Sequence, residues 1–258
     1  MYKHKLLCRF CRGNKCKRCS ARAYLRCASP ALQGVHSNWI MDDVLGMARP
    51  SDRMVDADDI KLLDQFQKHG ITAIFNLTES GEHPWCGDGL LPNGFTYTPE
   101  RFMAAGVKHF NFNWEDLTAP TVDVAISVVS VAMAELEAGG KVALHCHAGL
   151  GRTGLIAACI IMARMPMVGA DAAVAMVREK RPGSVQTSWQ QAFVHQFKEA
   201  WPAYCASSAV GSSSSSRRPE DTVGWDESRV AVSASAPAPA SVSSPSADTL
   251  TRIGSVTQ

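Results

Sequence analysis

A cysteine and an arginine lie six positions apart in the segment KVALHCHAGLGRTG, residues 141–154. Cys146 ends a short apolar run, two glycines follow it, and Thr153 comes directly after Arg152. A thiolate is a nucleophile that can attack phosphorus, and a guanidinium can donate two coplanar hydrogen bonds to a tetrahedral dianion. This spacing therefore predicts phosphoryl transfer to Cys146, with Arg152 binding the phosphate.

The flanking residues indicate why an anion would bind between these two side chains. Residues 141–146 are typical of a buried strand and the residues from Thr153 onward of a helix, so a strand-to-helix turn lies between them. Backbone N–H groups and the helix dipole at such a turn attract anions, and glycines let the backbone approach a ligand closely. We expect the backbone of this turn to bind substrate phosphate through His147, Ala148, Gly149, Leu150 and Gly151.

The same turn should ionise the cysteine. A helix N-terminus and a nearby cation bring the pKa of a cysteine from about 8.5 to roughly 3.5–7.5. We therefore expect Cys146 to be a thiolate at neutral pH. A cysteine on a buried strand is more often only a small apolar side chain, and we interpret Cys159, inside the following helix, in that way.

The segment HCHAGLGRTG resembles the H-C-x-x-G-x-x-R-S/T-G signature of the cysteine-dependent protein tyrosine and dual-specificity phosphatases. The resemblance implies that His145 holds the turn and supports the thiolate, and that the Thr153 hydroxyl stabilises the thiolate as it leaves. From about Gln33 to Ala203 the chain resembles one branch of that family. This closer resemblance also implies a function at the cilium or the centrosome. The segments that carry this are GVHSNWIMDDVLGMARPS, GEHPWCG, GFTYTPERFMAAG and KRPGSVQT.

The leaving oxygen needs a proton, so a carboxyl group on a loop should face the turn. Asp116 lies in NFNWEDLTAP, thirty residues before Cys146, and this segment resembles the W-x-D acid loop of the family. Glu115 and Asp123 compete, but we expect Glu115 to point the other way and Asp123 to interact with a helix dipole. Asp116 is therefore the predicted general acid.

Four further side chains have more than one interpretation. Gln190 and Gln191 resemble the glutamine-bearing loop that positions the hydrolytic water in related enzymes, and they suit a polar helix face equally well. His83 and Cys86 follow a strand's carboxyl end, where ligands bind in open α/β sheets. They could contact substrate, or Cys86 could form a disulfide with Cys146 on oxidation. We favour a third interpretation, in which both side chains pack within the loop.

The predicted secondary structure alternates between helices and strands. We expect one helix between Ser51 and Gly70, with Ser51 as its cap, then a strand over 71–78 and extended pieces at 95–98 and 107–114. An amphipathic helix follows from residue 122, and the strand at 141–146 precedes further helices, including 168–180 and 188–201. This order predicts an α/β fold with a mostly parallel sheet and helices on both faces, like that of the protein tyrosine phosphatases.

Composition divides the 258 residues into three parts: a basic, Cys-rich arm at 1–30, a catalytic domain at 31–205 and a disordered Ser/Ala/Pro-rich tail at 206–258. In the arm, Cys8, Cys11, Cys16 and Cys19 form C-x2-C-x4-C-x2-C. This pattern can bind zinc, but its two pairs are unusually close together. Membrane association by acylation, a partner or nucleic-acid contact, and disorder are alternatives. We expect a flexible arm with no bound metal or cofactor and no nucleic acid.

Nine cysteines, with no apolar signal segment and no spanning helix, indicate reduced thiols and a cytoplasmic protein. Tensin-type phosphoinositide phosphatases carry lysines where this turn has His147 and Leu150, and we find no phosphotyrosine-recognition loop of the classical receptor-type enzymes. We therefore expect a monomeric protein phosphatase that acts on phosphotyrosine and on phosphoserine or phosphothreonine. The alternatives are a phosphoinositide phosphatase, a phosphoprotein-binding pseudophosphatase scaffold and a sulfur transferase.

Overall fold

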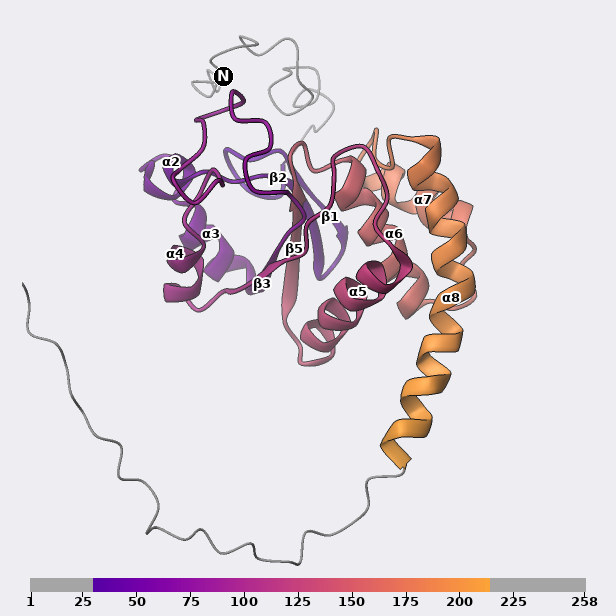
Figure 1. Ribbon diagram of the computed structural model, residues 1–258. Coiled ribbons are helices and arrows are strands. Elements are labelled where there is room, and N and C mark those ends of the chain that lie inside the picture. The colour runs from indigo at the N-terminus through magenta and orange to yellow at the C-terminus, as the bar shows by residue number, and fades with distance from the viewer. Residues whose placement is uncertain (1–29, 214–258) are drawn as a thin grey trace, which may run out of the picture. The chain divides into compact units, whose positions relative to one another are not determined.

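The computed structural model describes residues 30–213 (Figure 1), so residues 1–29 of the predicted arm and most of the predicted tail lie outside the described residues. Five strands form one sheet in the order β1-β2-β5-β3-β4. They are β1 Ser37–Met41, β2 Val44–Ala48, β3 Ile71–Asn76, β4 Lys108–Asn111 and β5 Lys141–Cys146. β1 is antiparallel to β2, and all other pairs are parallel, which confirms the predicted mostly parallel sheet.

β5 lies at the centre of this sheet and brings the cysteine to its edge. On one side Cys146 is opposite Ala48 of β2, and on the other side His145 is opposite Asn76 of β3. Because parallel strands end at the same edge, the segments that follow β2, β3 and β5 meet there. The functional side chains can therefore come from segments that are far apart in the sequence.

Helices cover both faces of the sheet, as predicted (Figure 1). The alternation of side chains along β5 divides the core, since Val142 and Leu144 pack into one apolar cluster and Ala143 into the other. The smaller cluster includes side chains from α2 Asp52–Asp56, α3 Leu62–His69 and α4 Pro99–Ala104. The larger cluster includes those from α5 Val122–Glu137, α6 Gly151–Arg164, α7 Ala170–Lys180 and α8 Ser188–Ser213.

The structure corrects the predicted helix between Ser51 and Gly70. That segment forms two helices, α2 and α3, with residues 57–61 between them. Ser51 precedes α2, but its hydroxyl does not cap the helix and donates instead to Asp88 at 2.6 Å. The break falls in the acidic run DADD, where aspartates compete with helical hydrogen bonds. Gly70 does end α3, with φ of 69°.

Other boundaries also differ from the predictions. The hairpin of β1 and β2 was not predicted, residues 95–98 form no strand, and α4 follows them. The last helix, α8, continues to Ser213, past the predicted helix end at Trp201 and the predicted domain boundary at 205. Within residues 30–213, no helix combines the length and the apolar character needed to span a membrane.

Candidate active site

A short turn joins β5 to α6, and we call residues 147–152 the amide turn. Gly149 within it has φ of 69°, in the left-handed region that favours glycine. A Cβ atom added there would lie 2.0 Å from the carbonyl oxygen of Met47. The turn therefore packs directly against the end of β2, and the predicted need for glycine at this position has a steric cause.

The carbonyl groups of residues 147–150 all accept hydrogen bonds from outside the amide turn. The first accepts from the Arg49 N–H at 3.2 Å, the two middle ones from the Arg181 guanidinium, and the last from the Val185 N–H at 3.1 Å. The N–H and C=O of successive residues in one trans peptide point in opposite directions. Within the described part of the chain, the N–H groups of residues 148–152 donate to no protein acceptor, so they are placed to bind an anion.

Arg181 is a second buried arginine at this site, and sequence reasoning missed its role. Its guanidinium also donates to Asn38 Oδ1 at 2.7 Å and to His36 Nδ1 at 3.2 Å. Burial, and then the charge of Arg181, lower the pKa of His36 to about 3, so His36 stays neutral. The only available signal was the quoted segment KRPGSVQT, which contains Arg181 but does not show which carbonyls it binds.

The side chain of Arg152 is fully buried and heavily hydrogen-bonded. Its Nη1 donates to the carbonyl oxygens of Leu77 and Trp114, each at 2.8 Å. The Glu82 carboxylate accepts from Nη1 at 2.8 Å and from Nη2 at 2.6 Å, and Asp116 Oδ1 lies 3.1 Å from Nη2. Nε makes no hydrogen bond to any described residue, which leaves a buried donor suited to a phosphate oxygen.

The charges of Cys146 and of two carboxylates act on the Arg152 guanidinium. Burial lowers the pKa of Arg152, but the hydrogen bond with Glu82 and the charges of Cys146, Glu82 and Asp116 outweigh it and raise that pKa. Cys146 itself is 2% exposed at the base of the amide turn. The arginine therefore stays charged beside the cysteine.

Glu82 is a site residue that the sequence did not reveal. It lies in the long loop after β3, seventy residues before Arg152, and has no local motif with it. Arg49 holds this loop, because its guanidinium donates to the carbonyl oxygens of Glu82, His83 and Cys86 at 2.9–3.0 Å. The position of Glu82 depends on contacts that only the folded chain brings together.

Asp116, the predicted general acid, is a second carboxylate that reaches Arg152. It contacts Arg152 and lies 3.0 Å from His83 Nε2. Burial raises the pKa of Asp116, but the hydrogen bond from His83, the charge of Arg152 and the Leu117 N–H together lower it. The two competing acids, Glu115 and Asp123, are exposed, and Asp123 lies in the first turn of α5 as expected.

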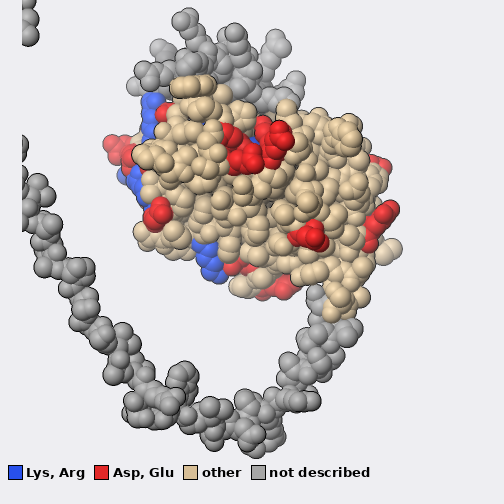
Figure 2. Space-filling view, in the orientation of Figure 1, with Lys and Arg blue, Asp and Glu red and all other residues tan. Residues whose placement is uncertain are grey.

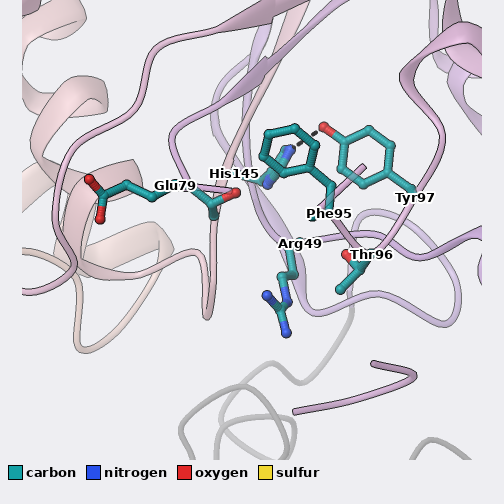
Figure 3. Close-up of a pocket in the computed structure, with 8 residues that line it drawn as sticks. Arg49, Glu79, Phe95, Thr96, Tyr97 and His145 are labelled. Atoms are coloured by element: carbon teal, nitrogen blue, oxygen red, sulfur yellow. Dashed lines mark hydrogen bonds between the residues drawn. The ribbon is translucent and has the colours of Figure 1, made fainter. Parts of the chain in front are cut away.

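His145 is buried, and its ring points toward Tyr97 (Figure 3). The Tyr97 hydroxyl lies 2.8 Å from Nε2 of His145 and 2.8 Å from Nε2 of His109. Burial is the main cause that lowers the pKa of His145 to about 3, so its imidazole is neutral. His145 is thus placed to hold the end of β5, which agrees with a structural role rather than that of a base.

The structure separates the two glutamines that the sequence left open. Gln190 is fully buried, and its amide donates to the carbonyl oxygen of Thr118 in the acid loop at 3.1 Å. Gln191 donates to Asp171 on α7 instead. A Cβ atom at Gly151 would lie 3.0 Å from the Gln190 amide, so this side chain borders the amide turn.

Thr153, which follows Arg152, is fully buried. Within the described residues its hydroxyl makes no hydrogen bond, so no bond to the Cys146 sulfur is present. Its predicted role in the second step stays a prediction. Cys159 is buried in α6, where burial raises the pKa of its thiol, consistent with its interpretation as an apolar side chain.

His83 and Cys86 lie beside the amide turn. The His83 ring stacks on the ring of His147, with centroids 3.9 Å apart. No disulfide joins Cys86 to Cys146, so the alternative in which the two pair on oxidation stays a hypothesis. The arm cysteines at 8, 11, 16 and 19 lie outside the described residues.

A mostly parallel α/β sheet, with a cysteine, an amide-lined turn and a buried arginine at the end of its central strand, defines the class of cysteine-dependent phosphatases. The family model described as dual specificity phosphatase, catalytic domain, matches residues 54–200. The chain belongs to this family, which confirms the predicted resemblance.

Similar proteins support this assignment. The chain is 41% identical over 190 residues to protein tyrosine phosphatase domain-containing protein 1 of Bos taurus, a match that covers 73% of this chain and 23% of that protein. It is 32% identical over 139 residues to dual specificity protein phosphatase CDC14C of Homo sapiens, covering 54% of this chain and 27% of that protein. The crystal structure of Tk-PTP in its active form is 26% identical, with a TM-score of 0.52, and the match covers 63% of this chain and 96% of that one. The chain thus spans about a quarter of the length of these curated relatives.

Proposed function

We propose that this chain hydrolyses phosphate monoesters on proteins through a phosphocysteine at Cys146. The observation that carries the proposal is the set of buried donors around the cysteine. The N–H groups of residues 148–152 and Nε of Arg152 have no acceptor among the described residues, and all belong to the segment that follows Cys146. A phosphate dianion supplies the acceptors that such donors require.

In the first step, the Cys146 thiolate attacks phosphorus, so that the S–P bond forms while the ester P–O bond breaks. Asp116 gives its proton to the leaving oxygen. Arg152 and the amide turn stabilise the charge that develops on the equatorial oxygens. In the second step a water molecule attacks phosphorus, Asp116 takes a proton from that water, and the S–P bond breaks to return the thiolate.

The remaining predicted residues have supporting roles in this proposal. The Thr153 hydroxyl donates to the departing thiolate in the second step. Gln190 borders both the acid loop and Gly151, and in this proposal it orients the attacking water. His145 positions the end of β5, and Arg181 positions the carbonyl groups of the turn. The last two act through other residues and do not touch the reacting atoms.

The charge of the domain favours phosphoproteins over phosphoinositides as substrates. On the face shown in Figure 2, the red acidic side chains are more prominent than the blue basic ones, and an acidic surface is repelled by an anionic membrane. His147 and Leu150 stand in the turn where lysines would bind extra phosphates of an inositol ring. We propose dual specificity for phosphotyrosine and phosphoserine or phosphothreonine, by a monomer acting in the cytoplasm.

The proposal is tested with p-nitrophenyl phosphate and with phosphopeptides that carry each of the three phosphorylated residues. The wild-type chain should hydrolyse them, and Cys146→Ser should reduce the rate at least a thousandfold because the nucleophile is lost. Cys205→Ser, at an exposed site on α8, is the matched control and should keep the wild-type rate. Binding of phosphopeptide without turnover by the wild-type chain would support the pseudophosphatase alternative, and preferential turnover of a phosphoinositide would support the lipid alternative.

A further inference from the structure

The loop after β3 carries a short turn with two side chains of types that can bind metals. His83 and Cys86 are three residues apart, and the Cys86 N–H donates to the His83 carbonyl at 3.1 Å. The Arg49 guanidinium donates to the carbonyl oxygens of both residues and so fixes the backbone of this turn. An imidazole and a thiol at this spacing on a closed turn resemble the ligand pairs of zinc sites.

A third ligand comes from the amide turn. The donor atoms of His83, Cys86 and His147 all lie within 4.8 Å of one another. In a tetrahedral zinc site with ligand bonds of 2.0–2.3 Å, neighbouring donors are about 3.5 Å apart. A contraction of about 1 Å therefore brings the three atoms into coordination geometry. Because a metal binds imidazole in the plane of the ring, the His83 ring must tilt away from that of His147, and its side chain is 34% exposed.

The surroundings of His83 match those of a metal-bound histidine. Such a histidine usually donates its second ring N–H to a carboxylate, which fixes the ring and its tautomer. Nε2 of His83 already lies 3.0 Å from Asp116 and 3.9 Å from Glu82, so we assign Nδ1 as the ligand atom. The two carboxylates also add negative charge next to the cation.

We propose that His83, Cys86 and His147 bind a zinc ion beside the amide turn, and that the bound ion inhibits the phosphatase reversibly. Two nitrogens and one thiolate suit zinc better than the hard cations, which prefer oxygen ligands. Binding needs no catalytic activity, whereas the inhibition rests on the function proposed above. The ion would fix the His83 ring, whose Nε2 lies 3.0 Å from Asp116, and this contact would keep the Asp116 side chain from moving to the leaving group.

Binding is tested by cobalt spectroscopy on the full chain, with Cys8, Cys11, Cys16, Cys19, Cys27 and Cys146 replaced by Ser to remove the competing thiols of the arm and the nucleophile. We expect one Co²⁺ per chain, with a thiolate-to-cobalt charge-transfer band that zinc abolishes. Adding Cys86→Ser should remove the band, and adding His83→Ala should weaken binding at least tenfold. Cys205→Ser, the matched control, should leave the spectrum unchanged. A band that survives Cys86→Ser, or no binding below millimolar Co²⁺, would overturn the proposal.

Inhibition is tested in the chain that lacks only the five arm cysteines. Zinc should inhibit p-nitrophenyl phosphate hydrolysis, and chelation with EDTA should restore it. Cys86→Ser should keep the metal-free rate and raise the half-inhibitory zinc concentration at least tenfold. Equal inhibition of both proteins would refute the inhibitory role. If the chain hydrolyses no phosphate ester at all, the cobalt titration still decides whether the metal site exists.

Discussion

Arg152 contacts two carboxylates, Glu82 and Asp116, which differ in how they bind the guanidinium. Glu82 accepts two hydrogen bonds from the guanidinium and belongs to the loop that Arg49 clamps. Asp116 makes one contact, at 3.1 Å, and is also held by His83. A phosphate that uses Nε and Nη2 of Arg152 competes directly with Asp116. Glu82 can keep its bond to Nη1 and so hold the plane of the guanidinium.

Glu82→Gln should therefore lower kcat/KM by about 10- to 100-fold, because the neutral amide orients Arg152 less firmly. It should also lower the free energy of unfolding by roughly 2 kcal/mol, since one partner of a buried ion pair loses its charge. Steady-state kinetics and urea unfolding measure the two effects. Glu79→Gln, on the same loop, is the control. Wild-type kinetics for Glu82→Gln would show that Glu82 does not position the arginine.

Asp116→Asn should lower the rate by about 10²–10⁴-fold for an alkyl phosphate such as phosphoserine peptide. The loss should be much smaller for p-nitrophenyl phosphate, whose leaving group needs little protonation. The measurement is the ratio of the two rate losses. Glu115→Gln, the exposed neighbour, should change neither rate. Equal losses for both substrates would contradict the role of Asp116 as general acid.

At the scale of elements, the backbone conformation of the amide turn depends on the segments that pack around it. Arg181 and the N–H groups of Arg49 and Val185 bind its carbonyl oxygens, and the Cα of Gly149 lies against β2. The sequence could predict the strand, the turn and the helix, because their signals lie within one continuous segment. It could not predict Arg181 or Glu82 as partners, because those contacts join segments that only the sheet brings together.

Gly149→Ala should inactivate the protein and destabilise it by about 2–4 kcal/mol, because the new methyl group meets the Met47 carbonyl and the residue also has a positive φ. Gly139→Ala separates the two causes. Gly139 has φ of 82°, but a Cβ atom there would meet nothing within 4 Å. We expect a loss of only about 1 kcal/mol and normal activity for Gly139→Ala. Thermal unfolding and p-nitrophenyl phosphate turnover provide the comparison, and equal losses for both variants would mean that the close approach at Gly149 has no effect.

At the scale of the whole molecule, the order of apolar segments in the sequence predicts the α/β architecture. It does not predict the hairpin of β1 and β2. Its strands have five residues each, and β2 is buried throughout, so no alternation marks it. Yet Asn38 of β1 and His36, directly before this strand, contact Arg181, and we call these three residues the Arg181 cluster. The other strand, β2, supports the amide turn. The site therefore depends on a hairpin that the alternation of apolar and polar residues in the sequence does not reveal.

The Arg181 cluster should make the stability of the domain depend on pH. The pKa of His36 is about 3 in the folded protein, and about 6.5 is usual for an unfolded chain. Between these values the unfolded state binds a proton that the native state excludes, so stability falls as the pH falls from 6.5 toward 3. Between pH 7 and 5.5 this one histidine should cost about 1 kcal/mol. His36→Gln should reduce the measured loss in urea unfolding by that amount, while the other histidines contribute equally to both proteins. The same loss in His36→Gln as in wild type would show that His36 takes up its proton without unfolding the chain.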